Sequence, residues 1–144
     1  IRMAQADRNR WDAKIMLHTI REMEQAFSRL EMFKRRRKVT VFGSARTAPD
    51  HPLYAVAREM GAALAANDYM AITGAGAGIM TATHEGAGLD HSLGFNITLP
   101  FEQRSNTVVH GTSHDLAFGF FFLRKCSRIS QRAACLCMSA KFPA

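Results

Sequence analysis

The chain has 144 residues, of which 47% are hydrophobic and 22% are charged, and it carries a formal net charge of +7. These proportions exclude disordered and collagen-like chains, and a chain of this length can bury a core of its own. Its apolar runs fall short of the roughly 20 residues that a membrane helix needs, and no apolar signal segment begins the sequence. We therefore expect a cytoplasmic protein without a membrane partner.

The positive charge lies mostly outside the most regular part of the sequence. The run KRRRK occupies residues 34–38, and further arginines are scattered over the first 37 and the last 21 residues. Basic surfaces can attract nucleic acid. The placement of these charges favours a solvated basic face instead, so nucleic acid is not an expected partner.

The first predicted element is a long amphipathic helix over residues 12–33. Apolar side chains recur there at steps of four and three, which places them on one helical face. We expect this stripe to be buried against the rest of the domain or against a second subunit. Its members are Met16, Ile20, Met23, Phe27 and Leu30.

From residue 39 onward, β-prone runs alternate with helical runs. A strand at 39–42 stops at Gly43-Ser44, and Asp50, His51 and Pro52 begin a helix that Asn67-Asp68 ends. Alternation at this spacing predicts right-handed crossovers and a parallel sheet with helices on both faces, which is an α/β fold. The helix between these signals is expected over 53–66, and after it come a strand at 69–73, a helix at 79–87 and a strand at 93–98.

Two turns that follow strands carry the strongest chemical signal. Gly43-Ser44-Ala45-Arg46 follows the first strand, and the glycine turn (residues 74–78, GAGAG) follows the second. Ligands of open parallel sheets sit beyond the carboxyl ends of the strands, and glycines let a phosphate approach backbone N–H groups at a helix N-terminus. Both turns are therefore candidate phosphate-binding segments.

Taken alone, the glycine turn leaves a second interpretation open. It matches neither the G-x-G-x-x-G dinucleotide fingerprint nor the G-x-x-x-x-G-K-[ST] loop of nucleotide triphosphatases. A tight turn in which a helix packs on a strand needs the same small residues.

Metal and redox chemistry find no support in the residue pattern. The histidines form no metal-like i, i+4 pair, because His110 and His114 are four residues apart but lie outside the predicted helices. The C-x-C spacing of Cys135 and Cys137 fits neither a zinc ribbon nor a C-x-x-C redox pair. We expect no metal site and no cofactor.

Several phrases, taken in order, resemble one family. They are VFGSAR (41–46), ITGAGAGIM (72–80), HEGA (84–87), GFNITLPFEQRSN (94–106) and FFLRK (121–125). Together they resemble the LONELY GUY (LOG) family in its longer bacterial form, formerly labelled lysine decarboxylases. The resemblance implies a Rossmann-like fold, a homodimer and no metal or organic cofactor. It also implies a phosphoribohydrolase, which cleaves the N-glycosidic bond of a nucleoside 5'-monophosphate of the AMP or cytokinin type to base and ribose 5-phosphate.

The resemblance also implies roles for individual residues. It places Arg124 and Glu102 in catalysis, where a cation and a carboxylate suit an oxocarbenium-like transition state. Met80 is expected on the base or ribose side. The other substrate-binding residues that it implies are Gly43, Ser44, Gly74, Gly76, Gly78, Asn106 and Lys125.

After residue 125 the resemblance ends. The family continues into P-G-G-x-G-T-x-x-E, whose glutamate takes part in the chemistry, and this motif is absent from the 144 residues. A run at 133–138 could still form a strand. We expect a helix and basic linker over 1–38, a nucleotide-binding domain over 39–125 and a divergent tail over 126–144 that reflects an incomplete gene model or a shifted reading frame. We also expect this chain alone to be inactive, which leaves a non-catalytic nucleotide-binding module as the alternative function.

Overall fold

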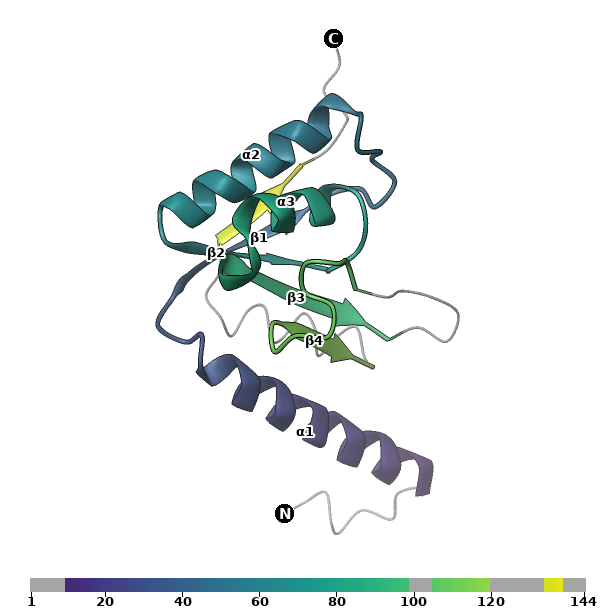
Figure 1. The fold of residues 1–144 in the computed structure, drawn as a ribbon. Coiled ribbons are helices and arrows are strands. Elements are labelled where there is room, and N and C mark those ends of the chain that lie inside the picture. The colour runs from purple at the N-terminus through teal and green to yellow at the C-terminus, as the bar shows by residue number, and fades with distance from the viewer. Residues whose placement is uncertain (1–9, 99–104, 120–133, 139–144) are drawn as a thin grey trace.

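The computed structural model of the chain describes residues 10–98, 105–119 and 134–138. Its centre is a five-stranded sheet in the order β4-β3-β2-β1-β5, and every neighbouring pair is parallel (Figure 1). This confirms the predicted α/β, Rossmann-like sheet. The strands are β1 (Arg37–Phe42), β2 (Tyr69–Thr73), β3 (Ser92–Ile97), β4 (Asp115–Phe118) and β5 (Ala134–Cys137).

Helices cover both faces of the sheet, as predicted. In Figure 1, α2 and α3 lie on one side of the strands and α1 lies on the other. The predicted start of α2 is confirmed, because the Nδ1 atom of His51 accepts a hydrogen bond from the Leu53 N–H at 3.1 Å and Pro52 opens the helix. The helices are α1 (Arg10–Glu31), α2 (Pro52–Ala66), α3 (Ile79–Ala87) and the short 3-10 helix η2 (Leu89–His91).

The two edge strands differ in how well the sequence predicts them. β5 lies within the run at 133–138, for which the sequence left a strand possible, and its Leu136 pairs with Val41 of β1. β4 was not predicted, and its Asp115 pairs with Gly94 of β3. Since β5 belongs to the sheet, part of the expected divergent tail contributes to the fold, while the domain division at residues 38 and 125 stays a prediction.

The main core fills the space between α1 and the sheet. Ala26, Leu30 and Phe33 come from the end of α1 and the turn after it. Burial of such apolar side chains stabilises the fold by about 25 cal/mol for each Å² removed from water. The sheet contributes Met70, Ile72, Leu93, Phe95, Ile97, Leu116 and Phe118.

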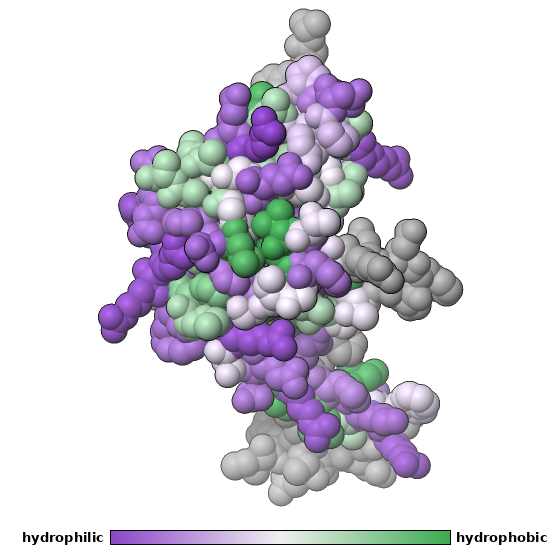
Figure 2. Space-filling model, viewed as in Figure 1, coloured by the Kyte–Doolittle hydropathy of each residue, from purple (hydrophilic) through white to green (hydrophobic). Residues whose placement is uncertain are grey.

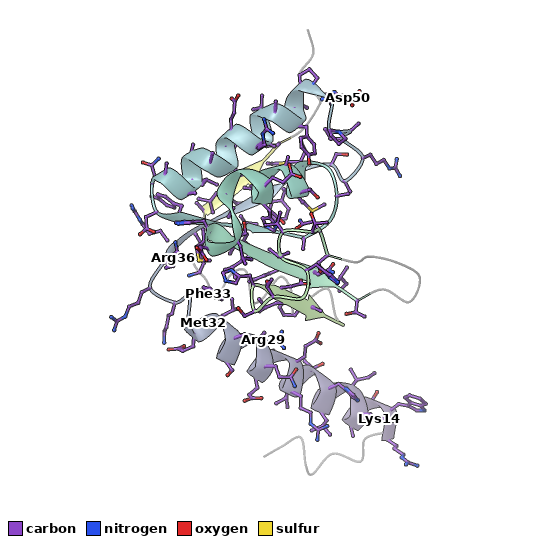
Figure 3. The ribbon with its side chains drawn as sticks, viewed as in Figure 1. Lys14, Arg29, Met32, Phe33, Arg36 and Asp50 are labelled. Atoms are coloured by element: carbon purple, nitrogen blue, oxygen red, sulfur yellow. The ribbon has the colours of Figure 1, made fainter. Side chains whose placement is uncertain are left out.

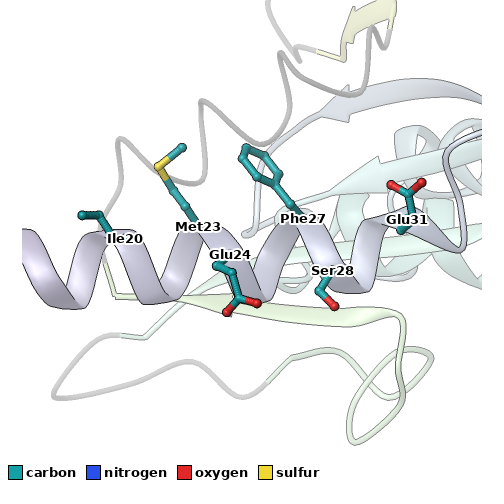
Figure 4. A pocket seen from close by; sticks show the side chains of 6 residues that line it. All are labelled: Ile20, Met23, Glu24, Phe27, Ser28 and Glu31. Atoms are coloured by element: carbon teal, nitrogen blue, oxygen red, sulfur yellow. The ribbon is translucent and has the colours of Figure 1, made fainter.

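The apolar stripe of α1 is only partly covered by the chain. Leu30 is 2% exposed and Met23 packs against the core, whereas Ile20 is 60% and Phe27 is 41% exposed. Ile20, Met23 and Phe27 project from the same side of the helix and line a shallow pocket (Figure 4). Burial of the whole stripe within the chain is therefore wrong for Ile20 and Phe27. The side of the helix that faces the core carries Ala26 and Leu30, and Phe27 lies beside this side although Met23, one turn earlier, packs against the core. A second subunit remains a prediction.

On the opposite face, α2 and α3 cross in close contact. Val41, Tyr54 and Ile79 form the centre of a smaller core there. At the crossing, a Cβ added at Gly86 would overlap the carbonyl oxygen of Arg58. Only a residue without a side chain lets the two backbones approach this closely.

The basic run after α1 is less solvated than expected. Lys38 is buried, and its Nζ donates to the carbonyl oxygens of Phe33 at 2.6 Å and Arg36 at 2.8 Å. The Arg36 guanidinium donates to the Asp90 carbonyl oxygen at 2.6 Å and lies 3.3 Å from the Asp68 carboxylate. Phe33 and Arg36 mark this junction between α1 and the sheet in Figure 3. The solvated basic face is therefore wrong for these two residues, which tie the linker to the sheet.

The visible surface is mostly hydrophilic over α1 and α2, and a small hydrophobic area lies between them (Figure 2). Within the described ranges, no helix combines the length and the apolar character that a membrane crossing needs.

Candidate functional site

The two candidate turns pack against each other at the carboxyl ends of β1 and β2. The Ile79 N–H donates to the carbonyl oxygen of Ser44 at 3.1 Å. A Cβ at Gly43 would overlap the Ile79 side chain, and a Cβ at Gly78 would overlap the Ser44 carbonyl oxygen. Two of the predicted glycines are thus explained by contact between the turns, which form one continuous surface.

The glycine turn takes a conformation that side chains resist. Gly78 has φ 64° and ψ −129°, and Ala75 has φ 58°. Both values lie in the left-handed half of backbone space, which costs an ordinary L-residue about 1–2 kcal/mol. The turn nevertheless accommodates an alanine at position 75.

Three successive N–H groups of this turn find no acceptor among the residues that the structure describes. Those of Gly76, Ala77 and Gly78 make no hydrogen bond within the described ranges. Gly76 and Gly78 are buried residues, and buried N–H groups in proteins are nearly always paired with some acceptor. Successive free N–H groups before a helix form the kind of backbone concavity that binds anions.

Side chains from both turns surround these groups. The Ser44 Oγ accepts a hydrogen bond from the Arg46 N–H at 3.1 Å, which leaves the hydroxyl proton free to donate elsewhere. Arg46 itself is exposed, and it supplies a cation at the same edge of the sheet. Half-buried Met80 lies over the turn, because a Cβ at Gly76 would come within 2.7 Å of its Cε.

Behind the turn lies a buried polar trio: Thr73, His84 and Asn106. The Thr73 Oγ1 is 3.1 Å from the His84 Nε2, and the His84 Nδ1 is 3.1 Å from the Asn106 Nδ2. Thr73 ends β2, His84 lies in the middle of α3, and Asn106 follows β3 in the chain. The trio therefore joins three segments that are separate in sequence.

Burial sets the charge state of this histidine. His84 is fully buried, and loss of hydration lowers its pKa to about 4. The hydrogen bond with Asn106 acts in the opposite direction but does not offset the effect of burial. The imidazole is therefore neutral at physiological pH.

The structure brings seven of the predicted site residues together: Gly43, Ser44, Gly74, Gly76, Gly78, Met80 and Asn106. Glu102, Arg124 and Lys125 lie outside the described residues, and the substrate contacts of all ten stay predictions. No sequence pattern singled out Thr73, and His84 entered only as part of the phrase HEGA. No three His, Cys, Asp or Glu side chains among the described residues gather into a possible metal site.

The strand order places the site at a distinctive point of the sheet. From β1 the chain moves outward through β2 and β3 to β4, and β5 then lies on the other side of β1. Ligands of such sheets bind where connections leave in opposite directions, outside the carboxyl ends of the strands. The turn after β1 lies at that point, and the glycine turn packs against it.

Comparison with known proteins identifies a family with a Rossmann-type fold. The family model of the SLOG cluster4 family matches residues 36–117, which is more than half of the chain. SLOG denotes the SMF/DprA-LOG superfamily, which includes LOG-like Rossmann-fold proteins. No curated protein matches the chain.

Proposed function

The chain belongs to the SLOG cluster4 family, and we propose that it binds a nucleoside 5'-monophosphate with the phosphate at the glycine turn. Family membership indicates a function related to nucleotides. The observation that carries the finer proposal is the row of N–H groups at Gly76, Ala77 and Gly78, none of which bonds to a described residue. A phosphate accepts several such bonds at once and gains from the positive end of the α3 dipole.

The neighbouring side chains support the same ligand. Arg46 can pair with a phosphate dianion, and the Ser44 hydroxyl can donate to a phosphate oxygen. Met80 offers an apolar, polarizable surface beside the turn, which suits a ribose or a base. AMP and cytokinin nucleotides are the ligands that we propose, because both combine a phosphate, a ribose and a base.

A phosphoribohydrolase is the catalytic form of this proposal. The reaction needs a carboxylate near the ribose and a cation near the departing group, for which Glu102 and Arg124 are the candidates. Since P-G-G-x-G-T-x-x-E is absent from the sequence, we expect these 144 residues to release little or no adenine from AMP. Release of adenine at enzymatic rates, measured by chromatography, would instead support hydrolysis by these 144 residues.

Titration calorimetry with AMP and adenosine tests the binding step. We expect AMP to bind more tightly than adenosine, because only AMP carries the phosphate. Gly76→Asp should abolish this difference in affinity between AMP and adenosine, since it adds a negative charge beside the N–H groups of the glycine turn.

A control variant separates local charge from total charge. Ala63→Asp adds the same charge at an exposed position of α2 and should leave AMP binding unchanged. Equal affinity for AMP and adenosine in the wild-type chain, or equal binding by Gly76→Asp and wild type, would contradict the proposal.

A further inference from the structure

The trio behind the glycine turn consists of polar side chains that are almost wholly removed from water. Thr73 and His84 are fully buried, and Asn106 is 9% exposed. Burying polar groups costs free energy unless they are hydrogen-bonded, and apolar residues of similar size would usually serve a core as well. The hydrogen bonds that the trio makes therefore indicate what these three residues do in the structure.

These bonds converge on the peptide groups on both sides of Ala75. The Ala75 N–H donates to the Thr73 Oγ1 at 2.9 Å. The Asn106 N–H donates to the Ala75 carbonyl oxygen at 2.7 Å, and its Nδ2 donates to the Gly76 carbonyl oxygen at 3.3 Å. Thr73 and Asn106 thus hold Ala75, whose φ is 58°, by its N–H group and by its carbonyl oxygen.

His84 connects these two holding residues. Its ring touches Thr73 through Nε2 and Asn106 through Nδ1, and among the described contacts it is the only side chain that meets both. Either neutral tautomer gives each ring nitrogen a partner, because the threonine hydroxyl and the asparagine amide can each donate or accept.

We propose that Thr73, His84 and Asn106 are positioning residues, which hold the glycine turn so that its unpaired N–H groups converge on one anion. His84 is the link that fixes Thr73 and Asn106 relative to each other. The anion is the phosphate of the ligand, so this inference rests on the proposed function, although the shape of the turn can be measured without any ligand.

Variants of Thr73 test the proposal with little change in side-chain volume. Thr73→Val removes the hydroxyl that holds Ala75, whereas Thr73→Ser keeps it. The matched control is Thr83→Val, because Thr83 is equally buried but its hydroxyl donates only to the Ile79 carbonyl oxygen within α3. Loss of one hydrogen bond to the turn should weaken AMP binding about tenfold in Thr73→Val. Thr73→Ser and Thr83→Val should bind AMP about as wild type does.

The second measurement is the set of backbone amide NMR signals of Ala75, Gly76 and Gly78 in the ligand-free chain. These signals should move in Thr73→Val and in His84→Leu, and they should stay in place in Thr83→Val. Unchanged signals in Thr73→Val, or equal losses of AMP affinity in Thr73→Val and Thr83→Val, would overturn the positioning role. If wild type binds no AMP, the proposed function fails, and the ligand-free signals alone decide whether the trio shapes the turn.

Discussion

Gly78→Ala is the substitution that should most damage the candidate site. At φ 64° and ψ −129° an alanine is strained by about 1–3 kcal/mol. Its Cβ would also overlap the Ser44 carbonyl oxygen and lie 2.9 Å from the Ala45 carbonyl carbon, and such overpacking costs about 1–3 kcal/mol more. We expect a loss of about 3 kcal/mol, which lowers the melting temperature by about 10 °C in a chain of this size.

Gly88→Ala is the control, because it isolates the strain of the backbone. Gly88 also has a positive φ, 73°, but a Cβ there would meet no atom within 4 Å. Thermal unfolding followed by circular dichroism should show a clearly smaller loss for Gly88→Ala, and calorimetry should show AMP binding retained only in this variant. If both variants melted at the same temperature, close packing of the two turns would not be the reason for glycine at position 78.

Three further predictions concern the core and the buried histidine. Gly86→Ala should lower the free energy of unfolding in urea by about 2–3 kcal/mol, because the α2 and α3 backbones must separate. In the same assay Leu30→Ala should cost about 2–5 kcal/mol, whereas Phe27→Ala should cost much less, because Leu30 is buried and Phe27 is 41% exposed. Because His84 has a folded-state pKa of about 4, the unfolded chain binds its proton first as the pH falls below about 6.5. Stability should therefore fall from pH 6.5 to about 4, by roughly 3 kcal/mol in all, and urea unfolding of His84→Gln should lack this part of the decline.

Local signals explain why several elements could be predicted from the sequence. α2 begins at a histidine cap followed by proline and ends at Asn67, whose neighbour Asp68 has φ 58°. Such signals act within a few residues, so they can be read directly. β4 carries none of them. It has four residues, and it is a strand because Leu116 and Phe118 pack under α1 while its backbone pairs with β3.

The apolar stripe of α1 shows a limit of periodicity. The spacing of Met23, Phe27 and Leu30 correctly indicates the apolar side of the helix. It contains no information on which part of that side faces the sheet, and this orientation decides that Ala26 and Leu30 are buried while Phe27 is not. Burial along a long helix is a tertiary property.

The candidate site divides in the same way. The glycine turn and its place after β2 could be predicted, since closely spaced glycines between a strand and a helix are a local signal of a tight turn. The polar trio could not, because Thr73, His84 and Asn106 meet only when β2, α3 and the segment after β3 have assembled. The residues around His84 in the sequence do not indicate that it is buried or which side chains it meets.

Ala75 links the turn and the trio, and it offers a final test. An alanine at φ 58° is strained by about 1–2 kcal/mol, so its backbone tends to leave this conformation when nothing holds it. Thr73 and Asn106 hold it from both ends. Glycine adopts the same φ without strain, so in an Ala75→Gly background the turn should keep its shape even after Thr73→Val. The amide signals of Gly76 and Gly78 should therefore move less on Thr73→Val in that background than in the wild-type chain. Equal movement in the two backgrounds would mean that the trio does not act against backbone strain. The hydrogen bonds from Thr73 and Asn106 would then matter as much for a glycine, which is unstrained at this φ, as for the alanine.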